Sequence, residues 1–417
     1  MTNPYLERAQ QLLQINRTAD AETELRKALA ENPNEAMALA LLAECYVHDK
    51  KFAEAVEMAQ KAVAAEAGEP LFYYVLGKCS FYNKDIAQAR LAINEGQRLD
   101  PGNANFFMLR SQIEFYQQNW EQALREADRG LELDPESVSL VNLRAQALVK
   151  LNRKEDASAT MDYALHKAPE NSYSHSNKGW VSIERGQYDG AQQHFLEALR
   201  LDPGNDHARE GLKEAIKAKN PVYRVILKYF LWMNKMQDRY QWGFIIGLYV
   251  LYRIALRLAE NVPALAPVLY PVIMLYVLFA FSTWIAKPIS NLFLRLHPVG
   301  KHALSDDEKL GSNLTGAAAL TCAICFAFYF AADSEPAFRA GLVSGIMLIP
   351  IGGTFSIPPQ MKARKNLAVY AIVLAVAGAI WVAVPGLTIA LGIFGLGVFA
   401  YGGVANYLIS KAGKEFF

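Results

Sequence analysis

Residues 21–33 read AETELRKALAENP, and the same pattern returns every 34 residues through the first half of this 417-residue chain. An alanine stands at the same place in each unit, namely Ala21, Ala55, Ala89, Ala123, Ala157 and Ala191. Seven positions later comes a second small residue, namely Ala28, Ala62, Gly96, Gly130, Ala164 and Ala198. A proline closes all units but the second, which has Ala67 there, and these prolines are Pro33, Pro101, Pro135, Pro169 and Pro203. A fixed period of this length indicates stacked supersecondary units that share one core.

Each unit has the pattern of two helices joined by a turn. Ala21, Leu25 and Ala28 are spaced i, i+4, i+7, so they lie on one face of a helix. A further small residue recurs earlier in every unit, and this set is Ala9, Ala43, Gly77, Ser111, Ala145 and Gly179. Two helices that meet through small residues and end at a proline turn form an αα-hairpin. Residues 2–205 are therefore predicted to form an all-α solenoid of six hairpins.

These units resemble the tetratricopeptide repeat (TPR) family, whose signature places small residues on both helices and a proline near position 32. The resemblance covers about half of the chain. It implies a TPR-like helical solenoid that binds a protein or peptide partner and is not an enzyme. Units one and two have Leu6, Gln10, Ala40 and Glu44 where a carboxylate-binding TPR has lysine and asparagine. The resemblance therefore does not imply binding of a free chain terminus.

In this family the first helix of each unit lines a concave groove. Carried over by position, the resemblance implies partner-binding residues on units three to five, namely Tyr74, Lys78, Phe81, Tyr82, Asn105, Met108, Gln112, Phe115, Tyr116, Asn142, Gln146 and Lys150. Tyrosine and methionine beside amide side chains suit an extended or helical peptide, because they combine apolar area with hydrogen-bonding capacity. The alternative is that some of these aromatic residues pack between the repeats.

Composition excludes several other classes of protein. The chain has 42 lysine and arginine residues against 41 aspartate and glutamate residues, so its net charge of +1 does not favour a nucleic-acid partner. Four cysteines do not form a secreted disulfide framework, and the first twenty residues hold no apolar segment typical of a cleaved signal. We expect the array in the cytoplasm, with no cofactor and no metal site.

Two segments follow the array. Residues 206–219 are predicted to be a solvated capping helix that ends the solenoid, with Lys213, Lys217 and Lys219 near its end. Residues 220–240 form a junction helix that interleaves aromatic and basic side chains. We interpret it as a helix on anionic lipid headgroups, with membrane-surface residues Arg224, Lys228, Trp232, Lys235 and Arg239. The alternative is a core helix docked on the last repeat.

The remaining residues, 241–410, are predicted to form a polytopic six-helix transmembrane bundle. Six apolar segments have the length that a bilayer requires, and they are 241–259, 264–286, 313–332, 337–358, 367–384 and 387–409. With six spans the loops on the array's side hold Lys287, Arg295, Lys301, Lys309, Lys362, Arg364 and Lys365, whereas the opposite loops hold Arg339 and, as an exception to the skew, Arg253 and Arg257. Positively charged loops stay inside, so we expect a multi-pass protein of the inner or plasma membrane with both termini cytoplasmic.

Several motifs in the apolar half suggest chemistry but are better explained by packing. Gly341 and Gly345 flank Ser344 and fit small-xxx-small helix contacts. Cys322 and Cys325 lie mid-span without a charge to activate them, so we interpret them as small apolar fillers. The function predicted is a membrane-anchored scaffold that holds a partner at the membrane, with homo-oligomer formation left open. The alternative is a small-molecule channel or transporter regulated through the array, with the helix broken at residues 350–354.

Overall fold

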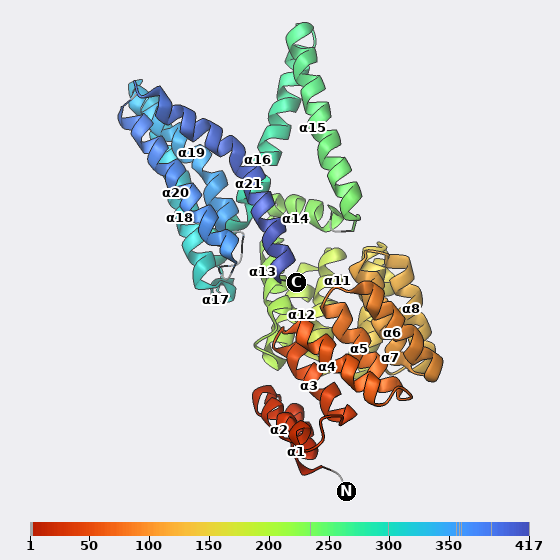
Figure 1. Cartoon of the computed structure of the whole chain (residues 1–417). Helices are drawn as coiled ribbons and strands as arrows, with labels where there is room; N and C mark the ends of the chain where they lie inside the picture. Colours follow the sequence, from red (N-terminus) through yellow and green to blue (C-terminus); the bar gives the residue numbers. More distant parts are fainter. Residues whose placement is uncertain are drawn as a thin grey trace. The chain divides into compact units, whose positions relative to one another are not determined.

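The computed structural model describes residues 3–416 except 234, 299, 356, 358, 360 and 385. The secondary structure of these residues consists of helices α1 to α21 (Figure 1). The chain divides into two compact units, Met1–Arg185 and Gly186–Phe417, and each is described by itself.

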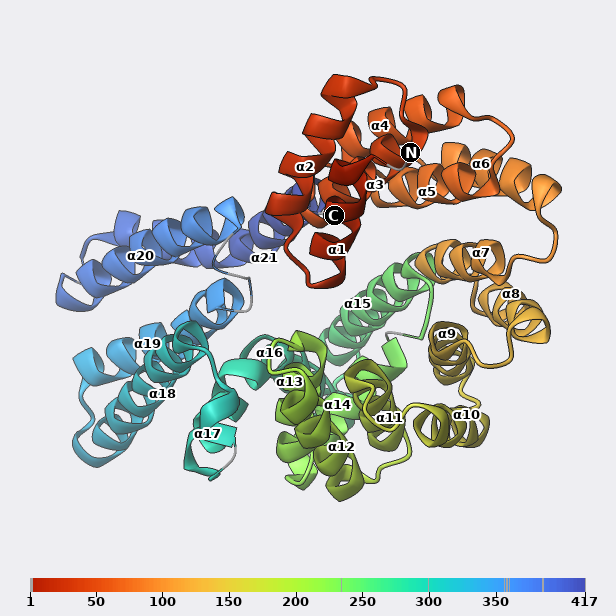
Figure 2. The ribbon, with the colours of Figure 1, turned by 90° about the horizontal axis from the view of Figure 1, so that it is seen from below.

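The first unit is a row of antiparallel helix pairs. Odd-numbered helices are the first of each repeat and even-numbered helices the second, and neighbouring pairs stack on one another (Figure 2). The helices are α1 (Pro4–Gln14), α2 (Thr18–Glu31), α3 (Ala36–His48), α4 (Phe52–Ala65), α5 (Pro70–Tyr82), α6 (Ile86–Leu99), α7 (Ala104–Tyr116), α8 (Trp120–Leu133), α9 (Val138–Lys150), α10 (Lys154–Lys167) and α11 (Ser172–Glu184). The recurring alanines, such as Ala21 and Ala123, are fully buried between them.

In repeats three and four the second small residue, a glycine, faces a side chain of the next repeat. A β-carbon added at Gly96 would lie 2.3 Å from the ring of Phe106, and one added at Gly130 would lie 2.8 Å from Leu140. Both Phe106 and Leu140 are buried on the first helix of the following repeat. At these two places glycine leaves room for a large side chain, since interiors are close-packed and have no space for a β-carbon as well.

The turn between the two helices of a repeat adopts a left-handed conformation that also recurs every 34 residues. The residues with positive φ are Asn16, Lys50, Lys84, Gln118, Asn152 and Gly186. At Lys50 the backbone forms a Schellman motif, because Lys51 N–H donates to Tyr46 O at 2.8 Å and Lys50 N–H donates to Val47 O at 3.1 Å. In the five earlier turns a non-glycine residue occupies a conformation that favours glycine.

A ladder of polar contacts joins the later repeats and is replaced by leucine in the earlier ones. Arg110 donates to Asn94 at 2.7 Å, Arg144 donates to Asp128 at 2.7 Å, and Lys178 donates to Asp162 at 2.6 Å. Each pair spans 16 residues, and successive pairs are 34 residues apart. At the same position repeats two and three have the buried residues Leu42 and Leu76. At this one register position the contact between repeats is thus apolar near the N-terminus and hydrogen-bonded further along.

The second unit begins with three shorter helices and continues with long apolar ones. Its helices are α12 (Tyr188–Leu201), α13 (Asp206–Lys217), α14 (Pro221–Met233), α15 (Asp238–Asn261), α16 (Ala266–Leu296), α17 (Gly300–Ala303), α18 (Asp306–Ala332), α19 (Glu335–Phe355), α20 (Lys362–Ala383) and α21 (Thr388–Phe416). Figure 2 shows α18 beside α19 and α20 beside α21.

Among the described residues, four helices are long and apolar enough to cross a membrane: Asp306–Ala332, Glu335–Phe355, Lys362–Ala383 and Thr388–Ala405. The prediction of six spans is therefore wrong in its number. Helix α15 carries Arg253, Arg257 and Glu260 in its second half, so its apolar stretch is too short. In α16 the apolar stretch lies within the described residues over Ala266–Leu278.

The motifs of the apolar half serve packing. A β-carbon on Gly341 would lie 3.3 Å from Cys325, and one on Gly345 would lie 3.0 Å from the sulfur of Cys322, so the two cysteines of α18 face the two glycines of α19. Residues 350–354 are helical, and the buried Tyr401 hydroxyl donates to Pro350 O at 3.0 Å. The described backbone at this point is packed rather than unwound around a substrate.

Helix α13 is joined to the start of the apolar helices by buried charges. Lys213 is 2% exposed and bonds Glu210 at 2.6 Å and Glu308, in the first turn of α18, at 2.7 Å. At the same end Arg364 of α20 forms a two-pronged ion pair with Asp307 at 2.6 and 3.0 Å. The expectation that α13 is a solvated cap is therefore wrong for Lys213 and Lys217, because packing against α16 and α17 buries both side chains.

The close contact at Gly96 makes a stability prediction. Gly96→Ala places a methyl group within the Phe106 ring, and overpacking of this kind costs about 1–3 kcal/mol of the free energy of unfolding. Thermal unfolding of the purified chain measures the loss, and Phe106→Leu in the same chain restores part of it. The control is Gly190→Ala, because Gly190 lies in α12 with nothing within 4 Å of its added β-carbon. An equal effect at both glycines would contradict the packing argument.

The left-handed turn allows a second stability prediction, in which the substitution raises the free energy of unfolding. Lys50→Gly removes the β-carbon that the left-handed conformation disfavours, so we expect a gain of about 1 kcal/mol in the free energy of unfolding. Lys50→Ala keeps the β-carbon and should give no gain. Chemical denaturation of the three proteins side by side measures the difference. If alanine stabilises the chain as much as glycine, the side chain rather than the backbone conformation is responsible.

Candidate functional site

The predicted groove residues Phe81, Tyr82 and Tyr116 of repeats three and four form an aromatic cluster with Phe52, which begins the second helix of repeat two. Tyr82 stacks on Phe52 with 6.0 Å between ring centroids, and Phe81 meets the edge of Tyr116 at 5.8 Å. Tyr82 and Tyr116 end the first helix of their repeats and are 42% and 52% exposed. The rings of Tyr82 and Tyr116 are therefore partly exposed to solvent and are supported by Phe52 and Phe81.

A second aromatic contact lies one repeat further along. Phe115 meets Trp120 edge to face at 4.9 Å, and the ammonium group of Lys150 lies 5.3 Å from the centre of the Trp120 ring. Sequence reasoning named Phe115 and Lys150 but missed Trp120, because it begins the second helix of its repeat. Asn105, Met108 and Gln112 lie on the same first helix as Phe115; Asn105 is exposed, and the other two are half-buried.

The lysine predicted on repeat three is paired across the repeat boundary. Lys78 Nζ lies 2.7 Å from a carboxylate oxygen of Glu44, at the equivalent position of repeat two. Burial lowers the pKa of Lys78, but Glu44 outweighs burial, so this pKa lies above its ordinary value. The ring of Tyr74 meets the edge of Phe106 at 6.1 Å, and burial raises the pKa of the Tyr74 hydroxyl.

The residues predicted on repeat five belong to a hydrogen-bonded network. Asn142 is buried, donates to Ser174 at 3.0 Å and accepts from Asn177 at 2.7 Å. Gln146 donates to the Tyr173 hydroxyl at 2.6 Å. The side-chain amide of Asn142 is thus engaged in hydrogen bonds inside the protein. Gln146 and Tyr173 lie at the edge of this network. Their role in partner binding stays a prediction.

Sequence reasoning missed a hollow in the first three repeats. It has a volume of 360 Å³, and residues of α1, α3 and α5 line most of it, among them Leu13, Met37, Ala40, Leu41, Glu44, His48 and Leu71. Ala40 stands where repeats three and four have Tyr74 and Met108, so its small side chain leaves space beside larger neighbours. The sequence does contain a signal for this hollow: at the position shared by Ala40, Tyr74 and Met108, repeat two has a small residue where repeats three and four have large ones.

A model of the tetratricopeptide repeat family matches residues 6–70, 51–104, 108–172 and 142–206. Residues 6–206 are tetratricopeptide repeats. The TPR array is therefore a protein–protein interaction domain of an all-α chain.

Several solved structures are similar to the TPR array. PilF of Pseudomonas aeruginosa is 23% identical over 49% of this chain and 94% of its own, with a TM-score of 0.41. YrrB, a TPR protein with an unusual peptide-binding site, is 16% identical over 45% and 97%, with a TM-score of 0.33. The first TPR of Spaghetti (RPAP3), bound to the HSP90 peptide SRMEEVD, is 21% identical over 28% and 94%, with a TM-score of 0.29. A search of curated proteins found no match.

The junction helix α14 has one packed and one exposed side. Leu227 and Met233 are buried, whereas Lys228 and Trp232 are exposed. Arg224 donates to Ala218 O at 3.1 Å and lies 5.1 Å from the ring of Tyr188. Lys235 is half-buried, and the side chain of Arg239 lies outside the described part of the structure. The membrane-surface role of these residues stays a prediction.

In the part of the chain that the structure describes, no group of three or more His, Cys, Asp or Glu side chains could hold a metal ion. Cys45 and Cys79 are buried, as expected from their equivalent repeat positions, and burial raises the pKa of each thiol to about 12.

The aromatic cluster supplies a test that separates binding from folding. Tyr82→Ala with Tyr116→Ala removes two half-exposed rings, so the melting temperature should change far less than for Phe106→Ala, which empties a buried site and costs about 3–5 kcal/mol. Removal of a central aromatic anchor costs about 2 kcal/mol or more of binding. Crosslinking from intact membranes measures partner capture, which the double variant should lose. A melting temperature as low as that of Phe106→Ala would place the two tyrosines in the core.

Proposed function

We propose that this protein is a membrane-anchored interaction scaffold, in which the TPR array holds a protein or peptide partner at the cytoplasmic face of a membrane. One observation carries the proposal. The chain that contains the TPR array also contains four apolar helices of membrane length, and a buried ion pair between Lys213 and Glu308 joins α13 to the first of them.

The surface of the four helices supports insertion into lipid. Large apolar side chains point outward along their length, among them Leu320, Ile324 and Phe330 of α18, Val369 and Ile372 of α20, and Ile389, Leu396 and Phe399 of α21. Only 6% of the apolar window of α18 is buried within the protein. Soluble monomers rarely expose contiguous apolar surface on this scale, so lipid is the medium that fits it.

Charge at the helix ends supports a cytoplasmic TPR array. The ion pair between Arg364 and Asp307 places the starts of α18 and α20 at one end of the four helices, and Lys309, Lys362 and Lys365 lie at that end too. The other end, where α18 meets α19, carries Asp333 and Glu335 with the single basic residue Arg339 among residues 326–340. By the positive-inside rule the end next to α13 faces the cytoplasm.

The chemistry of the array supports a partner segment with few charges. Among the predicted groove residues of repeats three and four, the exposed ones are Tyr82, Asn105 and Tyr116, and Lys78 is already paired with Glu44. Such a surface binds apolar side chains and backbone amides of an extended or helical peptide. The exposed side of α14, with Val225, Lys228, Phe230 and Trp232, would rest on lipid headgroups.

Cysteine labelling tests the topology. The four native cysteines are replaced by alanine, and Asp333→Cys or Lys362→Cys is introduced. An impermeant maleimide should label position 333 in intact cells and position 362 only after permeabilisation. Ile372→Cys is the control, because this lipid-facing position of α20 should react in neither case. Labelling of position 362 from outside, with position 333 protected, would overturn the orientation; extraction of the chain by alkaline carbonate would overturn membrane anchoring.

A further inference from the structure

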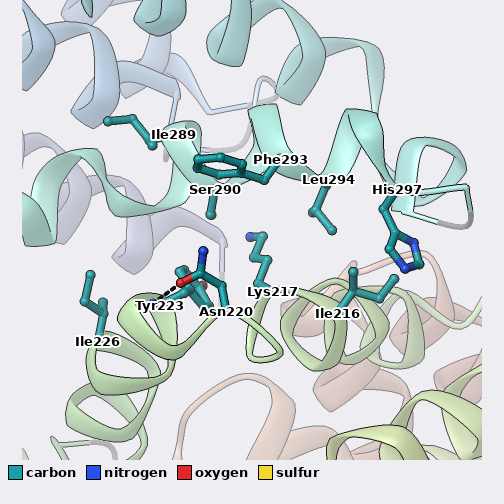
Figure 3. Close-up of a pocket in the computed structure, with 10 residues that line it drawn as sticks. All are labelled: Ile216, Lys217, Asn220, Tyr223, Ile226, Ile289, Ser290, Phe293, Leu294 and His297. Atoms are coloured by element: carbon teal, nitrogen blue, oxygen red, sulfur yellow. Dashed lines mark hydrogen bonds between the residues drawn. The ribbon is translucent and has the colours of Figure 1, made fainter.

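A cavity of 290 Å³ lies between α13, α14 and α16, and the proposed function does not use it (Figure 3). Ile226, Ile289 and Phe293 form apolar walls, whereas Lys217, Tyr223 and Ser290 contribute polar groups. In Figure 3 the ammonium group of Lys217 points between the wall formed by α13 and α14 and the wall formed by α16. The cavity is therefore amphipathic, with a cation on its polar side.

The charge in the cavity is held in place. Lys217 is 6% exposed, its ammonium group lies 3.3 Å from a carboxylate oxygen of Glu214, and it lies 5.5 Å from the centre of the Tyr223 ring. The Tyr223 hydroxyl donates to the other oxygen of Glu214 at 2.6 Å. Glu214 is thus shared between two donors, and none of the described residues that line the cavity is acidic. Lys217 is thus already ion-paired, and an anionic group with an apolar chain would share its ammonium group, which has three N–H donors.

Contacts between α16 and α18 set the level of the cavity relative to a bilayer. Helix α18 has 27 residues and is about 40 Å long, so a hydrocarbon core of about 30 Å leaves roughly its first seven residues outside. Asn313 comes next along α18, and Arg295 of α16 hydrogen-bonds to it. Phe293 and Leu294 line the cavity immediately before Arg295. The cavity therefore lies at the boundary between headgroups and hydrocarbon.

From this position and chemistry we infer that the cavity binds one anionic phospholipid, with the phosphate toward Lys217 and an acyl chain leaving along Ile226 and Phe293. The inference rests on the proposed membrane anchoring. A cavity of this volume lies at the lower end of the range for small-molecule sites, so it holds the glycerol phosphate and the first methylene groups, while the chains lie in the bilayer. Pockets with a basic side chain on the cytoplasmic side of membrane proteins are suited to such headgroups.

Native mass spectrometry of the full chain in nonionic detergent tests the inference. The probes are phosphatidylglycerol, phosphatidylcholine with the same acyl chains, and soluble glycerol 3-phosphate. The wild-type protein should retain one phosphatidylglycerol and bind the other two at least tenfold more weakly. Lys217→Met removes the charge, and Ile226→Trp fills the cavity without changing charge; each should weaken retention at least tenfold. Lys228→Met is the control, because Lys228 is exposed on α14 outside the cavity.

The possible results separate a lipid site in the cavity from lipid held on the outer surface. Equal retention by all four proteins would show lipid held by the outer surface and would overturn the inference. Loss in Lys228→Met to the same extent as in Lys217→Met would show general surface attraction and would also overturn it. Tight binding of glycerol 3-phosphate would replace the lipid by a soluble phosphoester. If Lys217→Met does not fold, Ile226→Trp decides alone. Carbonate extraction is measured separately, so failure of membrane anchoring is distinguishable from failure of the lipid site.

Discussion

Close approach of helices through small side chains is the constraint on which both halves of this protein depend. In the TPR array Gly96 and Gly130 admit Phe106 and Leu140 from the next repeat. Among the apolar helices Gly345 admits Cys322 in the same way. Apolar burial drives such contacts in water. Lipid, in which we propose that the apolar helices lie, offers no comparable driving force, so van der Waals packing at small residues would be decisive there. The same close approach at small residues thus occurs in both halves of the chain.

The connection between α13 and α18 depends on charged side chains rather than on small ones. Lys213 is almost completely withdrawn from water and Glu308 largely so, and such a pair gains its stability only when geometry and additional hydrogen bonds are good. Both conditions are met, because Lys213 also bonds Glu210, and Glu308 completes a capping box with Ser305. Apolar contact alone would permit several orientations of α13 on the helix ends, whereas these directional bonds define one.

The repeats were predictable because their signal is local and periodic. Small residues such as Ala21 and Gly96 recur at fixed spacing, so a single sequence specifies helix pairs, their length and their order. The site was less predictable. Exposed Tyr82 and buried Asn142 both satisfy the same positional rule, and only the neighbours, Phe52 for one and Ser174 for the other, decide which is accessible. The burial of Lys213 depends on a partner 95 residues away, which no local pattern reveals.

The change from leucine to polar pairs along the array has a mechanical consequence. Leu42 and Leu76 make contacts that have no preferred direction, so adjacent repeats can slide slightly while their apolar area stays buried. Arg144 and Lys178 form short, directional bonds that lengthen if the same movement occurs. At this register position the earlier interfaces are therefore the more compliant ones and the later interfaces the stiffer ones, whereas the ion pair between Lys78 and Glu44 restrains the boundary of repeats two and three.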